Sequence, residues 1–174
     1  MRLAVLIKQV PDTRSVQMDE TTGTVVRKSS DAILNPLDAY ALRAALLMKD
    51  AVPGSTVTAL SMGPASAEKA LREVLALGAD DAVLICDRAC AGSDTWATAV
   101  VLAAALQKHG PFDLVVTGER ATDGDTGQVG PEVAAHLNLS LATFVDEVSV
   151  NEDGLEVERK VETGLERWRL RLPA

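Results

Sequence analysis

Short apolar runs alternate with helical patterns over the first three quarters of this chain, and this alternation restricts the fold more than any other feature. Residues 3–8, 56–61, 82–86 and 114–117 have the length and composition of buried strands. A stretch with helical spacing follows each of them. Consecutive strand–helix units favour a parallel sheet with helices on both faces, joined by right-handed crossovers. We therefore predict a three-layer α/β/α fold with a mostly parallel sheet.

The first helix has a clear start signal. Asn35 is a good N-cap residue, Pro36 suits the first helical position, and Asp38 places a negative charge in the first turn. A later helix over residues 93–109 is expected to turn a stripe toward the sheet that includes Trp96. The stripe is completed by Val100, Ala103 and Leu106.

The pattern changes near residue 143. Residues 144–150, 155–161 and 166–172 resemble strands separated by hairpin turns, which predicts an antiparallel meander over about 143–172. Arg167, Arg169 and Arg171 alternate along the last strand; a solvated face is favoured over a patch that meets an acidic partner. Residues 15–27 are expected to form a short hairpin. We treat residues 1–174 as one nucleotide-binding domain.

A glycine-rich loop, residues 118–131, lies between the fourth strand and the fourth helix. Glycines let the backbone approach a ligand closely, and the helix start after them offers N–H groups that favour anions. Open α/β sheets bind nucleotides at such turns, so the loop predicts a nucleotide site. Residues 8–10, 62–63 and 87–88 end the other strands at the same edge. Pro131 leaves two alternatives: the helix starts near Gln128, or it is bent at the proline.

Composition excludes several classes of function. The net charge of −8 repels phosphate backbones, so we expect no nucleic-acid partner. No apolar run reaches about 18 residues, so no transmembrane segment is expected. Two cysteines, Cys86 and Cys90, are interpreted as structural residues of a chain in a reducing compartment, by default the cytoplasm. His109 and His136 have no evident catalytic partner, and we assign no catalytic or metal-binding residue.

Several motifs, in order, resemble the β subunit of electron transfer flavoproteins. They are residues 5–12 (VLIKQVPD), 34–41 (LNPLDAYA), 61–64 (SMGP), 70–72 (ALR), 76–80 (ALGAD) and 118–131. The resemblance implies an adenine-nucleotide-binding (HUP/Rossmann-like) domain that forms a heterodimer with an FAD-binding α subunit. It also implies electron transfer between acyl-CoA or other dehydrogenases and downstream acceptors.

The same resemblance implies a nucleotide within this subunit, either AMP or, in the electron-bifurcating subgroup, a second FAD. Gly127 stands where that subgroup usually has Ala. The family pattern also continues beyond Ala174, into a further strand, a partner-recognition loop and a C-terminal arm that embraces the α subunit. Carried over by position, the cofactor-binding residues are Leu6, Lys8, Asn35, Pro36, Leu37, Asp38, Met62, Asp123, Gly124, Asp125, Thr126, Gly127, Gln128 and Val129.

Two alternatives remain beside this reading. The first is a stand-alone ATP- or AMP-binding domain of the stress-protein or nucleotide-hydrolase type, although the Ser-Gly-Gly pyrophosphate loop of such hydrolases is missing from the sequence. The second is an interaction module that holds no nucleotide. The compound released on denaturation distinguishes the three hypotheses. FAD or AMP indicates the flavoprotein subunit, ATP indicates the stand-alone domain, and no compound indicates the interaction module.

Overall fold

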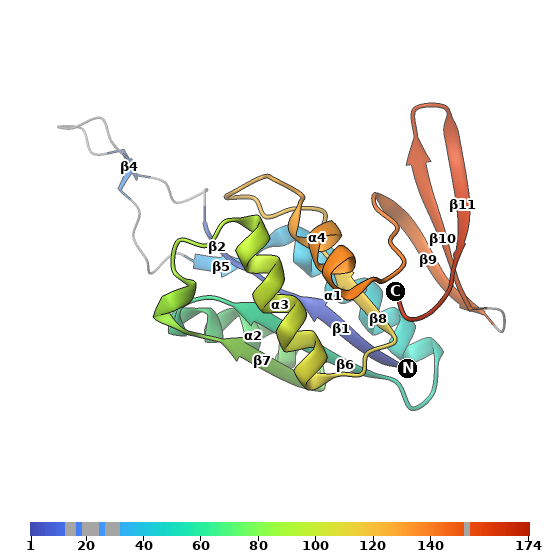
Figure 1. The fold of residues 1–174 in the computed structure, drawn as a ribbon, viewed down its shortest axis with the longest axis horizontal. Coiled ribbons are helices and arrows are strands. Elements are labelled where there is room, and N and C mark those ends of the chain that lie inside the picture. The colour runs from blue at the N-terminus through green and yellow to red at the C-terminus, as the bar shows by residue number, and fades with distance from the viewer. Residues whose placement is uncertain (13–16, 19–24, 27–31, 152–153) are drawn as a thin grey trace.

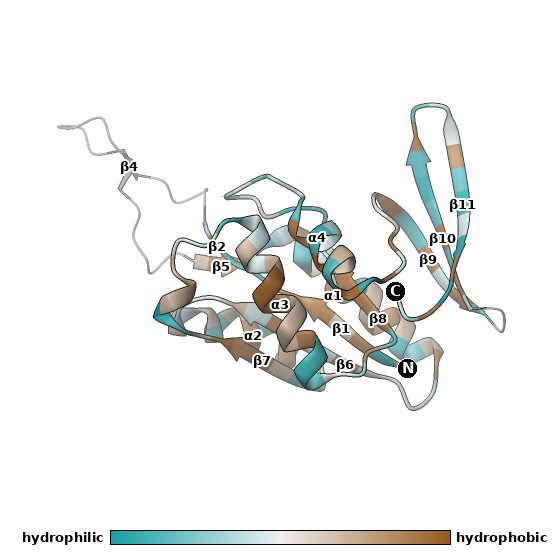
Figure 2. Ribbon diagram, viewed as in Figure 1, coloured by the Kyte–Doolittle hydropathy of each residue, from teal (hydrophilic) through white to brown (hydrophobic). Residues whose placement is uncertain are grey.

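A four-stranded parallel sheet forms the centre of the protein (Figure 1). The computed structural model describes residues 1–12, 17–18, 25–26, 32–151 and 154–174. The central strands are β1 (Arg2–Leu6), β6 (Thr56–Met62), β7 (Asp81–Ile85) and β8 (Leu114–Thr117). Their spatial order is β7-β6-β1-β8, and every neighbouring pair is parallel. Figure 2 shows apolar residues concentrated along these strands.

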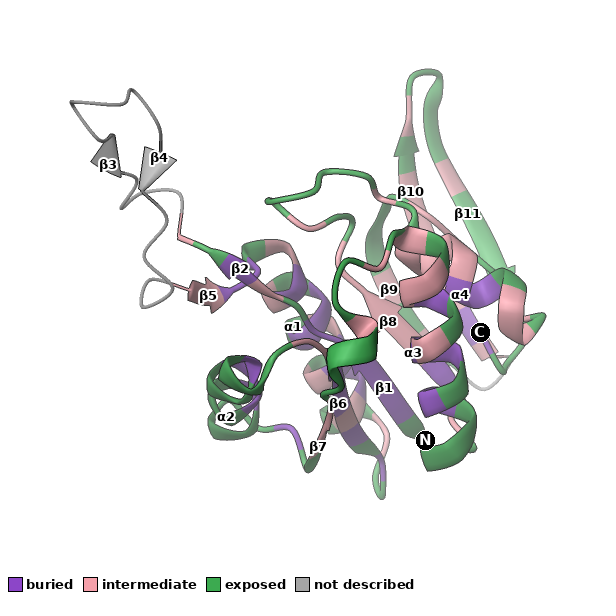
Figure 3. Cartoon of the chain, turned by 60° about the vertical axis from the view of Figure 1, so that its left-hand side comes forward, coloured by how far each residue is buried: buried purple, intermediate pink, exposed green. Residues whose placement is uncertain are grey.

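Two helices cover each face of the sheet. Leu3 and Val5 of β1 pack against α1 (Pro36–Ala51) and α2 (Glu68–Ala76). Ala4 and Leu6 point the other way, toward α3 (Thr95–His109) and α4 (Val129–Leu137). Because successive strand residues alternate between faces, a fully buried strand such as β1 must be apolar throughout. Figure 3 shows β1 buried between the layers, which confirms the α/β/α prediction.

The buried face of α3 differs from the prediction. Trp96 is 60% exposed and Val100 is 44% exposed, and the ring of Trp96 lies against that of His136 on α4, with centroids 4.4 Å apart. Ala103 and Leu106 of the predicted stripe are buried, together with Ala99, Leu102 and Ala105. Apolar residues surround most of this helix, so the sequence does not define one stripe, and packing against β6 and α4 selects the face.

The start of α4 resolves the alternatives left by Pro131. The helix begins at Val129 with Gln128 as its N-cap, so Pro131 lies in the first turn. A proline does no harm there, because the N–H groups of the first turn have no partner within the helix.

An antiparallel ribbon follows β1 and returns the chain to the sheet. β2 (Gln9–Pro11) pairs with β5 (Ala32–Leu34), and the Asn35 N–H then donates to the Lys8 carbonyl at 2.9 Å. Farther out, β3 (Gln17–Met18) pairs with β4 (Val25–Val26), in agreement with the expected hairpin. The turn predicted between them falls outside the described residues. The ribbon places the start of α1 beside the end of β1.

The C-terminal strands form the predicted antiparallel meander: β9 (Val145–Asn151), β10 (Gly154–Val161) and β11 (Gly164–Leu170), in the order β11-β10-β9 (Figure 1). Leu155 and Val157 anchor it to the core under α1. The side chain of Arg167 is 72% exposed and pairs with Glu158 at 2.8 Å, which fits the solvated face. β11 ends at Leu170, so Arg171 lies beyond the strand.

None of the helices in the described part of the chain combines the length and apolar character that a membrane crossing requires.

Candidate functional site

The strand order creates a switch point between β1 and β8. The chain proceeds from β1 to β6 and β7, and then returns to place β8 on the opposite side of β1. Connections leave the two strands in opposite directions there, which opens a crevice at their carboxyl ends. A cavity of about 790 Å³ lies at this edge of the sheet. Ligand pockets are commonly about 300–1,000 Å³, so the cavity has room for a nucleotide.

The cavity has an apolar floor and a polar rim. Leu6 and Leu60 come from the central strands, and Leu102 comes from α3. Lys8, Asp38 and the loop after β8 supply polar groups on one side, and the segment after β7 supplies them on the other. Pockets for small molecules usually combine such apolar walls with a few polar groups that orient the ligand.

The structure divides the residues proposed from the sequence into two groups. Those that line the cavity are Leu6, Lys8, Asp38, Met62, Gly124, Thr126, Gly127, Gln128 and Val129. Asn35, Pro36, Leu37, Asp123 and Asp125 do not line it, although all are described. The second group belongs to the loop and to the start of α1.

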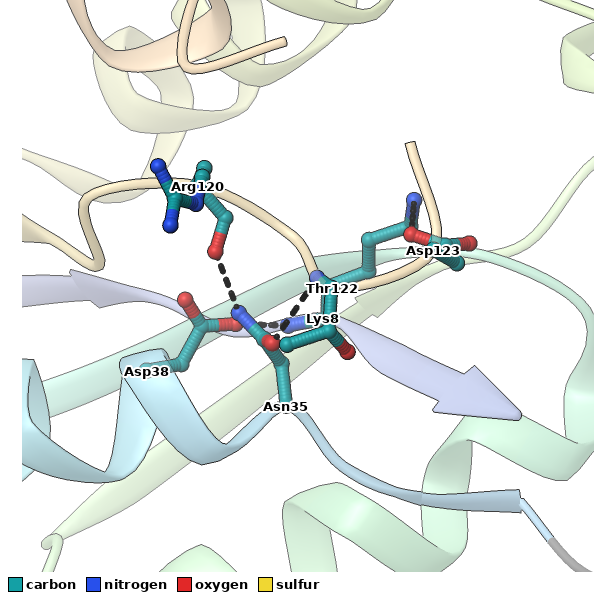
Figure 4. Close-up of polar contacts among 6 residues, drawn as sticks. All are labelled: Lys8, Asn35, Asp38, Arg120, Thr122 and Asp123. Atoms are coloured by element: carbon teal, nitrogen blue, oxygen red, sulfur yellow. Dashed lines mark hydrogen bonds and ion pairs between the residues drawn. The ribbon is translucent and has the colours of Figure 1, made fainter. Parts of the chain in front are cut away.

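Asn35 holds the loop rather than capping the helix. It is the N-cap by position, but its side chain makes no capping hydrogen bond, which corrects the sequence expectation. Its Nδ2 donates to the Arg120 carbonyl at 3.0 Å, and its Oδ1 accepts from the Thr122 N–H at 3.3 Å (Figure 4). The Asn35 side chain is fully buried, so the two bonds replace water around loop backbone groups.

Asp38 joins the ends of the two strands that border the switch point. Its carboxylate accepts hydrogen bonds from the backbone N–H groups of Lys8, at 2.7 Å, and Gly118. Burial raises the pKa of Asp38 from 3.8 to about 6, against the opposing effects of these two bonds, of a hydrogen bond from the Asn35 side chain and of the Lys8 charge. Position 118 requires glycine, because a Cβ there would lie 2.9 Å from the Asp38 backbone nitrogen.

Ion pairs complete the support of the loop. Lys8 Nζ pairs with Asp123 Oδ1 at 2.7 Å across the switch point (Figure 4). Arg120 contributes to the cavity wall, and its guanidinium pairs with Asp125 at 2.7 Å and Glu119 at 3.0 Å. Asp125 adopts a left-handed conformation, with φ of 56°. These contacts fix the shape of the loop.

Sequence reasoning missed most of the opposite wall. It placed residues 87–88 at the crevice, but the lining continues through residues 90–95 to Thr98. The Asp94 carboxylate caps α3 by accepting from the Ala97 N–H at 2.8 Å. An Asp before a long apolar run is a helix-start signal that would have located this wall. Thr95 Oγ1 lies 3.1 Å from Gln128 Oε1, so the starts of α3 and α4 meet at the cavity.

The arrangement suits binding of an anionic compound with a flat apolar part. Two helix N-termini open onto the cavity, and helix N-termini favour anions. Added atoms at Gly124 would meet nothing within 4 Å, so the loop leaves open space where it borders the cavity. Backbone amides, hydroxyls and an apolar floor are the groups that the site offers.

Comparison with known proteins identifies the family of this chain. The electron transfer flavoprotein domain family matches residues 22–174. The chain is 47% identical over 173 residues to a caffeyl-CoA reductase–Etf complex subunit, CarD, of Acetobacterium woodii, and 46% identical to an electron transfer flavoprotein subunit beta of Clostridium acetobutylicum. It is 44% identical to protein FixA of Azotobacter vinelandii. These matches cover 99% of this chain, which spans 63–66% of the length of those relatives. The chain therefore belongs to the electron transfer flavoprotein domain family.

Proposed function

We propose that this chain is the nucleotide-holding part of an electron transfer flavoprotein β subunit. The observation that carries the proposal is the cavity at the β1–β8 switch point, bordered by the glycine-rich loop. The names of the relatives support the electron-transfer role. In this role the chain binds and orients a cofactor and supplies no catalytic side chain of its own.

The proposed cofactor is an adenine nucleotide, either AMP or FAD. The apolar floor fits a purine or flavin ring, and the starts of α3 and α4 fit phosphate oxygens. A bound FAD would accept and donate electrons, and the chemistry of that exchange belongs to the flavin. Leu6 and Leu60 would exclude water from the ring, while Asp38 and Asn35 keep the loop in place.

The proposed partner is an FAD-binding α subunit, and the complex would serve acyl-CoA or other dehydrogenases. The support is the naming of the relatives as β subunits and as a subunit of a reductase–Etf complex. We propose the cytoplasm as its location, since both cysteines are unpaired and free thiols suit a reducing compartment.

The decisive experiment identifies what the protein holds. The chain is purified alone and with its α partner, denatured, and the released compounds are identified by mass spectrometry, while absorbance counts flavins per complex. Two flavins per heterodimer would support FAD as the nucleotide of this subunit. One flavin and one AMP per heterodimer would support AMP instead. ATP bound by the chain alone would favour the stand-alone ATP-binding domain. A complex that releases neither flavin nor AMP would overturn the proposal.

A further inference from the structure

Both thiols of the chain line the same wall of the cavity. The sequence contains two cysteines, and neither forms a disulfide. Cys86 follows β7 directly and is exposed, while Cys90 ends the short 3-10 turn η4 (Arg88–Cys90) and is half-buried. Both contribute to the cavity lining, so a group attached to either sulfur would occupy or border the space proposed for the nucleotide.

The backbone that carries these thiols is well held. Asp87 Oδ1 accepts from the Ala89 N–H at 2.9 Å, and the Cys90 N–H donates to the Asp87 carbonyl at 3.0 Å. The Cys90 carbonyl accepts from Ser93 Oγ at 2.9 Å, just before the start of α3. The wall is therefore a hydrogen-bonded turn that continues into a helix.

The same turn carries a cationic residue. Arg88 lies between the two cysteines in the sequence and also lines the cavity. A guanidinium binds carboxylates with directed hydrogen bonds, so this wall is suited to a thiol compound that carries carboxylates.

We propose that Cys86 and Cys90 form a modification site for low-molecular-weight disulfides of the glutathione class, and that a mixed disulfide there and a bound nucleotide exclude each other. The inference rests on the proposed function, because the exclusion requires the nucleotide to occupy this cavity. The mixed disulfide would block nucleotide binding in a redox-dependent way, and neither cysteine would need a partner protein to form it.

The chemical step is thiol–disulfide exchange. A cysteine thiolate attacks one sulfur of the small disulfide, its S–S bond breaks, and a new S–S bond joins the cysteine to that half of the reagent. The other half leaves as a thiolate and takes up the proton that the cysteine released. A small thiol in excess reverses the reaction and restores the open cavity.

The test compares labelling with and without nucleotide. The purified chain is incubated with glutathione disulfide alone, with FAD, or with AMP, and adducts are counted by intact-mass measurement. Under mutual exclusion the labelling rate falls by the factor 1 + [nucleotide]/Kd, about tenfold at a concentration near ten times Kd. The adducted protein should bind FAD or AMP at least about tenfold more weakly, and dithiothreitol should restore binding.

Variants assign the site and control for general effects. In Cys86→Ser the label should move to Cys90, and in Cys90→Ser it should move to Cys86. The double variant should take no label, and its own Kd for FAD or AMP is measured as the reference for the control that follows. Adding Glu73→Cys to the double variant creates a matched control, because Glu73 is exposed on α2 outside the cavity. Nucleotide should leave the labelling of that position unchanged.

The outcomes separate the two proposals. If bound nucleotide does not slow labelling, and labelling does not weaken nucleotide binding, the thiol site is overturned and the proposed function stays intact. Failure of the unmodified chain and of its α complex to bind FAD or AMP would overturn the proposed function and the exclusion together. Equal protection of the Glu73→Cys control would also refute the inference, since the protection would then not come from occupancy of the cavity.

Discussion

The buried carboxyl of Asp38 should make the stability of this protein fall as pH rises. Asp38 is 6% exposed, and burial raises its pKa from 3.8 to about 6. Between these values the unfolded chain has released the proton while the folded chain still holds it. Because the unfolded state then binds fewer protons, the free energy of unfolding decreases as pH rises through this window.

The size of the effect follows from the shift. One pKa unit corresponds to about 1.4 kcal/mol, so a shift from 3.8 to about 6 amounts to about 3 kcal/mol. This contribution is fully present below pH 3.8 and is lost once the pH has passed about 6. The Asp38→Asn variant stays neutral at every pH, and its amide oxygen keeps an acceptor for the N–H group of Lys8.

The assay is urea unfolding of the nucleotide-free chain, followed by far-UV circular dichroism between about pH 3 and about pH 7.5. Relative to Asp38→Asn, the wild type should lose up to about 3 kcal/mol of unfolding free energy over this range. Asp125→Asn is the matched control: it removes an equal charge from an exposed side chain, and Asn tolerates the left-handed backbone at that position. A wild-type to Asp38→Asn difference that stays constant with pH would refute the reasoning.

Four further substitutions test the loop. Asn35→Ala removes both hydrogen bonds to the loop backbone and should cost about 2 kcal/mol in urea unfolding, at about 1 kcal/mol per bond; a loss below about 0.5 kcal/mol would contradict the assigned role. Gly124→Val adds atoms where nothing lies within 4 Å, so the melting temperature should stay unchanged while the Kd for FAD or AMP rises at least about tenfold. Gly118→Ala should instead lower the melting temperature, because its added methyl group would meet the α1 backbone. Asp123→Ala breaks an exposed ion pair with Lys8 and should change stability by about 1 kcal/mol or less, while nucleotide dissociates faster in a displacement assay; unchanged dissociation would argue against a role for the loop.

Local signals determined the elements of this fold well. Apolar runs of strand length predicted β1, β6, β7 and β8, because a strand buried on both faces must be apolar along its length. The turn residues of the C-terminal part predicted the meander, because hairpin turns depend on short-range backbone geometry. The helix start at Pro36 was correct in position, since capping and proline preferences are also local.

The roles of individual side chains depended on contacts that sequence spacing does not show. Asn35 reaches Arg120 and Thr122, more than eighty residues away, and so supports the loop where local rules predicted a cap. The ring of Trp96 packs against His136 on α4 rather than against the sheet, because α3 is apolar on several sides.

By itself, then, the sequence determined the strand–helix alternation, the glycine-rich loop and the family to which the chain belongs. Only the tertiary structure decided which residues border the cavity and which hold its walls from behind. The physical reason is that strand order decides which loops meet: β8 returns to the side of β1 opposite β6, and that pairing brings Lys8, Asp38 and Gly118 together. Propensities act over a few residues, whereas the site is made by neighbours far apart in the chain.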